Sequence, residues 1–239
     1  MRIVCLGDSL TSGFSQGDNK FPYGTVLQKL LDKECGKGKH EVITCGNNGE
    51  TAVSMAKRYA VTTEIAERRR LPPKLFIIMA GTNDLLAYPQ IEEDKIVNAI
   101  SAMVDAAAVD LAVAVVCTVP RMPAPEDRSP EYALTKRRYR LNELIVEKFG
   151  EDRVVDTSSL DAFEDDGLHL TKRGYAELAK LVYPACRAAM KRCRPSKKAG
   201  PPKTAPTPTP KKEAAPTPKT APAPEATATM KKLQAAYKT

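Results

Sequence analysis

The sequence contains no long hydrophobic run, no closely spaced cysteine pair and only two histidines. No segment approaches the roughly 18 consecutive apolar residues that a membrane-spanning helix needs. The first residues also lack the charged region, apolar region and small-residue cleavage site that mark a secretory signal peptide. These absences exclude a membrane-spanning class, and we expect a cytoplasmic protein.

The cysteines follow no pattern of a metal site or a redox motif. No CxxC pair and no zinc-type spacing connects the six, which are Cys5, Cys35, Cys45, Cys117, Cys186 and Cys193. In a reducing compartment such residues are free thiols, several of them buried. We therefore expect no metal and no disulfide framework.

The composition changes sharply near residue 195. Residues 195–239 contain 10 Pro, 10 Ala and 9 Lys but only two acidic residues. Such a segment cannot bury enough apolar surface to offset the entropy lost on ordering. The sequence therefore predicts one folded domain over residues 1–194 and a disordered Pro/Ala/Lys-rich tail over residues 195–239.

The positive charge is concentrated in the same C-terminal part. Residues 1–186 carry a formal net charge of −3, whereas residues 187–239 carry +11. A basic segment of this kind can contact an anionic partner such as nucleic acid, lipid or an acidic protein. The alternative is a solvated, solubilising tail, and the sequence leaves both open.

Short apolar, β-branched runs alternate with segments of helical periodicity along the first 192 residues. Strands are expected at residues 2–6, 41–45, 75–79, 111–118 and 154–156, and helices at 23–31, 52–70, 92–109, 132–149 and 171–192. Alternating strands and helices form right-handed crossovers around a parallel sheet. The pattern predicts an α/β fold, a three-layer α/β/α sandwich with about five parallel strands.

Four polar motifs fall at or just beyond the carboxyl ends of the expected strands. Because these ends meet at one edge of a parallel sheet, distant motifs can share one crevice there. The motifs are Gly7-Asp8-Ser9, Gly46-Asn47-Asn48-Gly49, Gly81-Thr82-Asn83-Asp84 and Asp166-Gly167-Leu168-His169.

The first and last motifs contain the parts of a serine nucleophile. Such a serine needs a base to take its proton and a carboxylate to orient that base. Of the two histidines, only His169 has a carboxylate three residues before it. We therefore interpret Ser9 as the nucleophile, His169 as its base and Asp166 as the orienting carboxylate.

The middle motifs contain candidate donors for the negative charge of a tetrahedral intermediate. The backbone N–H groups of Ser9 and Gly49 are two candidates, and the side-chain amide of Asn83 is a third. Each motif alone has a structural interpretation, since Gly, Asp, Ser and Asn favour turns and a lone histidine is more often structural. The complete set, in order at successive strand ends, favours the catalytic interpretation.

Four further residues are weaker candidates for substrate contacts. Asp8 more plausibly shapes the loop around Ser9, and Asn48 is a polar residue beside Gly49. Arg121 and Met122 lie in a proline-rich loop that follows the fourth expected strand. Arg121 suits an anionic group or a loop salt bridge, and Met122 is an adaptable apolar contact for an acyl group.

These motifs together resemble the four blocks of the SGNH, or GDSL, hydrolase family. The similarity covers residues 1 to about 190 and leaves out the tail. It implies a flavodoxin-like α/β/α fold and ester hydrolysis through an acyl-enzyme, without a metal or cofactor. It also implies the roles given above for Ser9, Gly49, Asn83, Asp166 and His169.

We therefore expect serine-dependent hydrolysis of carboxylic esters or thioesters of small to medium acyl chains. The runs at residues 8–13 and 166–174 are particularly similar to the family's small cytosolic acyl-esterases. One alternative is a carbohydrate O-deacetylase. Another is an enzyme domain tethered to an anionic partner by the basic tail.

Overall fold

The computed structural model describes residues 1–17, 19–67, 72–88, 90–121 and 130–193. Its contacts divide the chain into a unit of Met1–Arg194 and a unit of Pro195–Thr239. The second unit lies outside the described residues, so the disorder of the tail stays a prediction. No described helix combines the length and the apolar character that a membrane crossing demands.

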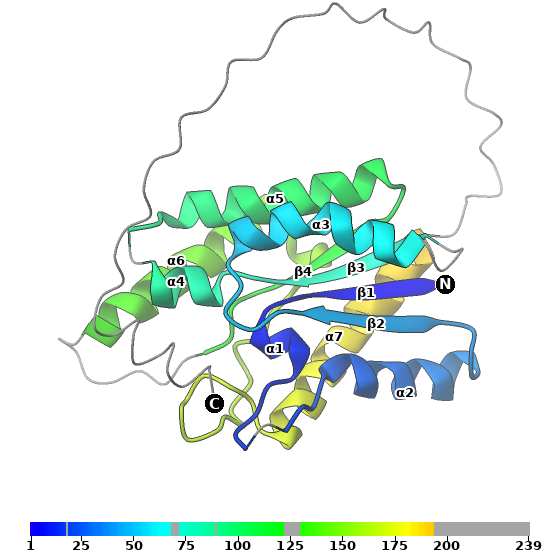
Figure 1. Ribbon diagram of the computed structural model, residues 1–239, viewed down its shortest axis with the longest axis horizontal. Helices are drawn as coiled ribbons and strands as arrows, with labels where there is room; N and C mark the ends of the chain where they lie inside the picture. The colour runs from blue at the N-terminus through cyan, green and yellow to red at the C-terminus, as the bar shows by residue number, and fades with distance from the viewer. Residues whose placement is uncertain (18, 68–71, 89, 122–129, 194–239) are drawn as a thin grey trace, which may run out of the picture. The chain divides into compact units, whose positions relative to one another are not determined.

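A five-stranded parallel sheet forms the centre of the described domain (Figure 1). Each neighbouring pair of strands is parallel and the order is β2-β1-β3-β4-β5. The strands are β1 (Arg2–Gly7), β2 (Glu41–Gly46), β3 (Pro73–Met79), β4 (Val113–Cys117) and β5 (Val154–Val155). All carboxyl ends therefore lie along one edge of the sheet.

Helices cover both faces of this sheet (Figure 1). One apolar cluster contains residues of α2 (Tyr23–Cys35) and α7 (Lys172–Arg192), packed on Ile3 and Cys5 of β1. The other contains residues of α3 (Ala52–Glu67), α5 (Glu93–Val109) and α6 (Pro130–Phe149), packed on Val4 and Leu6. Successive side chains of a strand point to opposite faces, so β1 serves both clusters. The expected α/β/α sandwich is confirmed.

Some helix and strand boundaries in the structure differ from those expected from the sequence. β4 begins at Val113 rather than at residue 111, because Leu111 is 81% exposed and has a positive φ of 55° in the turn after α5. Three short helical segments were not expected: α1 (Ser9–Ser12), α4 (Thr82–Ala87) and η1 (Glu151–Arg153). They are too short for helical periodicity to appear in the sequence.

Candidate active site

Ser9 lies at the point where β1 passes directly into α1. Asp8 caps this helix, since its carboxylate accepts the backbone N–H of Leu10 at 3.0 Å. Ser9 is the first residue of α1, and the first N–H groups of a helix have no partner within it. The turn therefore presents the Ser9 hydroxyl and backbone N–H at the carboxyl edge of the sheet.

A chain of hydrogen bonds joins Ser9, His169 and Asp166. The Nε2 atom of His169 lies 3.1 Å from Ser9 Oγ, and Nδ1 lies 2.6 Å from Asp166 Oδ2. The other carboxylate oxygen, Asp166 Oδ1, accepts the backbone N–H groups of Leu168 and His169, each at 2.9 Å. The aspartate is thus held by two amides while it orients the imidazole.

The charge state of Asp166 follows from these contacts. Burial raises its pKa, but the hydrogen bonds from the His169 ring and from the amides of Leu168 and His169 outweigh burial. The pKa of Asp166 is therefore lowered below its usual value. An ionised carboxylate is the form that stabilises a charged imidazolium.

The imidazole is also fixed by its surroundings. Only 3% of His169 is exposed, and its ring meets the Phe14 ring edge-on, with a centroid distance of 4.7 Å. The carbonyl oxygen of His169 accepts the Glu164 N–H at 2.8 Å. The motif lies in a turn before Lys172, where α7 begins.

The three candidate donors sit on different elements. Gly49 has a positive φ of 74°, a conformation that favours glycine. Asn83 lies in α4, and its Nδ2 donates to Glu50 O at 3.0 Å and to Asp8 Oδ2 at 3.3 Å. Both bonds hold the amide beside the Ser9 turn, and they give Asn83 two protein acceptors in this structure.

Gly46 lets the first two motifs approach each other. A Cβ atom at this position would lie 2.2 Å from Ser12 N and 2.7 Å from Asp8 O. Both contacts are with backbone atoms, which cannot swing aside as a flexible side chain can. Glycine at the end of β2 therefore permits α1 to pack directly against it.

Two buried aspartates, Asp8 and Asp84, hold the segments around the site by hydrogen bonds. Burial raises the pKa of Asp8 to about 7, against the opposing hydrogen bond from Leu10 and the nearby His169. Asp84 accepts the backbone N–H of Ala52 at 2.8 Å, and burial raises its pKa as well. Asp8 thus connects α1 to Asn83, while Asp84 fixes the start of α3.

An ion pair that the sequence analysis missed holds the Gly49 loop. The guanidinium of Arg58 binds the Glu50 carboxylate, with Nε 2.9 Å from Oε1 and Nη2 2.5 Å from Oε2. The same Nη2 donates to Cys45 O at 3.2 Å and to Gly7 O at 3.4 Å. Arginine and glutamate eight residues apart form no recognisable motif, so only the folded chain reveals the pair.

The candidate substrate contacts have different positions. Asp8 is fully buried, and Asn48 is exposed, with its Oδ1 accepting the Ser12 hydroxyl at 2.7 Å. Arg121 is exposed, and Met122 lies outside the described residues. Among the described residues, no group of three or more His, Cys, Asp or Glu is placed to hold a metal ion.

A parallel α/β sheet with Ser9, His169 and Asp166 joined at its carboxyl edge defines the class of serine-dependent hydrolases. The chain belongs to the GDSL-like lipase/acylhydrolase family, whose model matches residues 5–177. It is a carboxylic ester hydrolase. A comparison with curated proteins found no match.

Solved structures share this fold. An aryl esterase from M. smegmatis is 23% identical, with a TM-score of 0.61 over 79% of this chain and 99% of that one. A lipase/acylhydrolase from Enterococcus faecalis is 20% identical, with a TM-score of 0.62 over 82% and 98%. A carbohydrate acetylesterase family member from Sinorhizobium meliloti is also 20% identical, with a TM-score of 0.63 over 80% and 99%.

Proposed function

We propose that Ser9 is the nucleophile of ester hydrolysis. As its Oγ bonds to the ester carbonyl carbon, His169 Nε2 takes the hydroxyl proton and Asp166 stabilises the resulting imidazolium. The tetrahedral intermediate then releases the alcohol, which leaves with the proton from His169. Water hydrolyses the acyl-enzyme by the same steps, with His169 again acting as the base, and Ser9 is restored.

The negative oxygen of the intermediate needs fixed donors, and three groups supply them in this proposal. These are the backbone N–H groups of Ser9 and Gly49 and the side-chain amide of Asn83. The Asn83 bond to Asp8 is the longer of its two, at 3.3 Å against 3.0 Å. We infer that this longer bond gives way to the oxyanion, while the bond to Glu50 keeps the amide in place.

The observation that carries the proposal is the continuous chain from Ser9 Oγ to His169, 3.1 Å, and from His169 to Asp166, 2.6 Å. These distances are those of groups ready to transfer a proton. Ser9 and His169 are both buried, so few water molecules compete for the hydrogen bond between them.

A fluorophosphonate probe tests the nucleophile directly. Such a probe forms a covalent bond with an activated serine, so we expect labelling of the full chain that disappears in Ser9→Ala. Ser54→Ala is the matched control, because Ser54 is exposed on α3 and lies outside the proposed machinery. Labelling that persists in Ser9→Ala overturns the assignment.

The proposed substrates are carboxylic esters or thioesters of small to medium acyl chains. The second candidate is O-deacetylation of a carbohydrate, favoured by the fold shared with carbohydrate acetylesterases and by the exposed Asn48 beside Gly49. The ratio of kcat/KM for acetylated sugars to kcat/KM for alkyl and aryl acetates separates the two. A ratio well above one selects the carbohydrate substrate.

The role of the basic tail rests on its charge alone. Contact with an anionic partner predicts salt-dependent retention of the full chain on DNA or on anionic vesicles, lost when residues 195–239 are deleted. Retention that is absent at low salt rejects this role and favours a solvated tail. A cytoplasmic location also stays a prediction from the sequence.

A further inference from the structure

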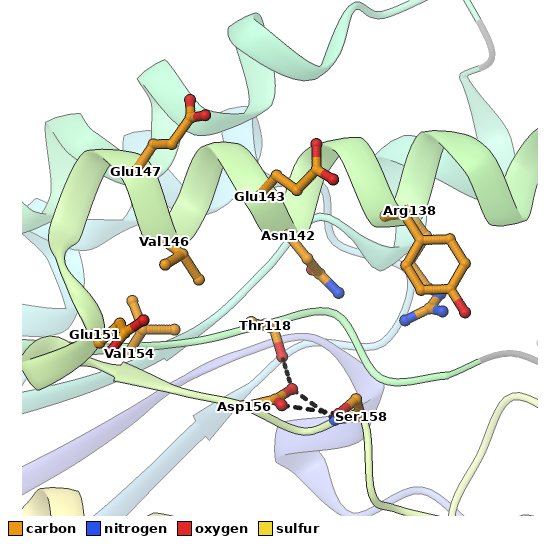
Figure 2. A pocket seen from close by; sticks show the side chains of 11 residues that line it. Thr118, Arg138, Asn142, Glu143, Val146, Glu147, Glu151, Val154, Asp156 and Ser158 are labelled. Atoms are coloured by element: carbon orange, nitrogen blue, oxygen red, sulfur yellow. Dashed lines mark hydrogen bonds between the residues drawn. The ribbon is translucent and has the colours of Figure 1, made fainter.

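A cavity of about 670 Å³ lies between α6 and the segments that follow β4 and β5 (Figure 2). Its walls include Thr118, Asn142, Val154 and Ser158, and none of the proposed catalytic residues lines it. The volume falls within the range of small-molecule sites.

One wall carries a buried arginine, Arg138, for which the described residues supply no counterion. Only 3% of Arg138 is exposed, and no carboxylate oxygen of a described residue lies within 4.0 Å of its guanidinium. Its Nη1 makes one long bond to Val119 O, 3.5 Å, and its buried Nε has no acceptor. The Tyr139 ring lies against the guanidinium, with Cζ 4.4 Å from the ring centroid, but it supplies no acceptor for the Nε–H donor. A buried positive charge is costly unless an anion compensates it, so the lining favours an anionic group here.

Figure 2 shows Arg138 and Asn142 extending from α6 toward the segment that holds Thr118, Asp156 and Ser158. The amide of Asn142 pairs with the backbone of Val119, since it accepts Val119 N–H at 2.8 Å and donates one N–H to Val119 O at 3.0 Å. The Ser158 hydroxyl donates to Asp156 Oδ2 at 2.8 Å. Arg138 is the cationic group in this wall, and its buried Nε–H has no acceptor among the described residues.

The rest of the lining is apolar or negatively charged. Val146 and Val154 supply an apolar surface, and the exposed carboxylates of Glu143, Glu147 and Glu151 stand along the rim. Four carboxylates in all, counting Asp156, repel a ligand with several negative charges. They attract a positive charge placed away from Arg138.

We propose that this cavity binds a zwitterionic small molecule with one oxyanionic group and one ammonium group. The oxyanion, a carboxylate or a phosphate ester, binds the Arg138 guanidinium. An apolar middle part lies on Val146 and Val154, and the ammonium group meets the acidic rim. Arg138 and the rim residue Glu147 lie nine positions apart on α6, about 14 Å along the helix axis, so the two charges of the ligand are well separated.

Titration of the ¹⁵N-labelled full chain tests this site. The probes are 4-aminobutanoate, 6-aminohexanoate and 8-aminooctanoate, with hexanoate and hexylamine as single-charge controls. We expect a saturable shift of the Arg138 Nε–H signal and a Kd for the best zwitterion at least about 10-fold below those of both controls. The pair 6-aminohexanoate and 6-aminohexyl phosphate then distinguishes a carboxylate from a phosphate ligand.

Variants test the two ends of the ligand separately, followed through the backbone amide signals of Asn142 and Ser158. Arg138→Met is expected to raise the Kd of the best zwitterion at least about 10-fold. Arg173→Met, at an exposed position of α7, is the matched control and should leave this Kd unchanged. The double variant Glu147→Gln/Glu151→Gln keeps hexanoate binding and removes most of the preference for the zwitterion over hexanoate.

Three results overturn the proposal: no saturable response to any probe, hexylamine binding as tightly as the zwitterions, or an unchanged Kd in Arg138→Met. If Arg138→Met fails to fold, the Arg138 Nε–H signal of the wild-type chain decides the oxyanion end, and a zwitterion that binds without shifting this signal overturns the proposal. Fluorophosphonate labelling of Ser9, read in parallel, should be the same in every variant. The cavity proposal and the proposed hydrolysis can therefore fail independently.

Discussion

The side-chain amide of Asn83 donates to the backbone carbonyl oxygen of Glu50 at 3.0 Å. This bond joins α4 to the loop that carries Gly49, while the carboxylate of Glu50 is bound by Arg58 of α3. Asn83 of α4 and Arg58 of α3 thus both bind Glu50, the residue that follows Gly49. The geometry of the proposed oxyanion site therefore depends on Glu50 and Arg58, which are not among its proposed donors.

Asp166→Asn is expected to lower kcat about 10³–10⁴-fold with little change in the fold. An asparagine cannot stabilise the imidazolium and can leave His169 in the wrong tautomer. The measurement is kcat for an aryl acetate together with circular dichroism. Asp165→Asn, at an exposed neighbouring position, is the control and should retain full activity. A loss of less than about 10-fold in Asp166→Asn would contradict the role given to this carboxylate.

Asn83→Ala is expected to lower kcat about 10²–10³-fold, because it removes one donor to the oxyanion. KM should change much less, since that charge develops only in the transition state. Steady-state kinetics separate the two parameters, with Asn98→Ala on the exposed side of α5 as the control. A rise in KM at constant kcat would instead make Asn83 a residue that binds the ground state.

Arg58→Met is expected to destabilise the fold by about 1–3 kcal/mol, because it leaves the Glu50 carboxylate, 9% exposed, without its cation. The Gly49 loop then loses its anchor, and kcat falls roughly 10–100-fold through misplacement of the donor. Urea unfolding and kinetics measure the two effects. Arg58→Lys should restore only part of kcat, because lysine lacks the forked donor geometry. Lys57→Met, exposed on the same helix, should change neither quantity.

Asp8→Asn is expected to change how stability depends on pH. Because burial raises the pKa of Asp8 to about 7, the native state keeps a proton that the unfolded state releases near the ordinary value of 3.8. Wild-type stability therefore loses a contribution as the pH rises from about 4 to about 7, by at most about 1.4 kcal/mol per pH unit.

The asparagine variant cannot release this proton, so its stability relative to wild type should rise across the same interval and level off above it. Denaturant unfolding at several pH values gives the difference, and Asp105→Asn at an exposed position of α5 is the control. A difference that does not vary with pH would show that Asp8 is already ionised throughout this range.

Much of the architecture could be predicted from local patterns. The apolar run of β1 and the periodicity of α2 and α5 are visible in the sequence because burial on a sheet or helix face imposes a regular spacing. The family motifs are also visible in the sequence, because each is a short run of neighbouring residues and the four follow one another in order. Leu111 shows the limit of such patterns. It is apolar and lies just before β4, so the sequence suggests that it belongs to the strand, but its backbone forms the turn after α5.

The sequence by itself determined the order of strands and helices, the motif residues and the membership of a hydrolase family, because these depend on neighbours along the chain. Only the tertiary structure decided that His169 reaches Ser9 across the sheet edge, that Arg58 anchors Glu50, and that Arg138 lines a cavity with no carboxylate of the described residues at ion-pair distance. These relations depend on residues that lie apart in the chain and on the packing that sets where their side chains point. No local pattern encodes the distances between such groups.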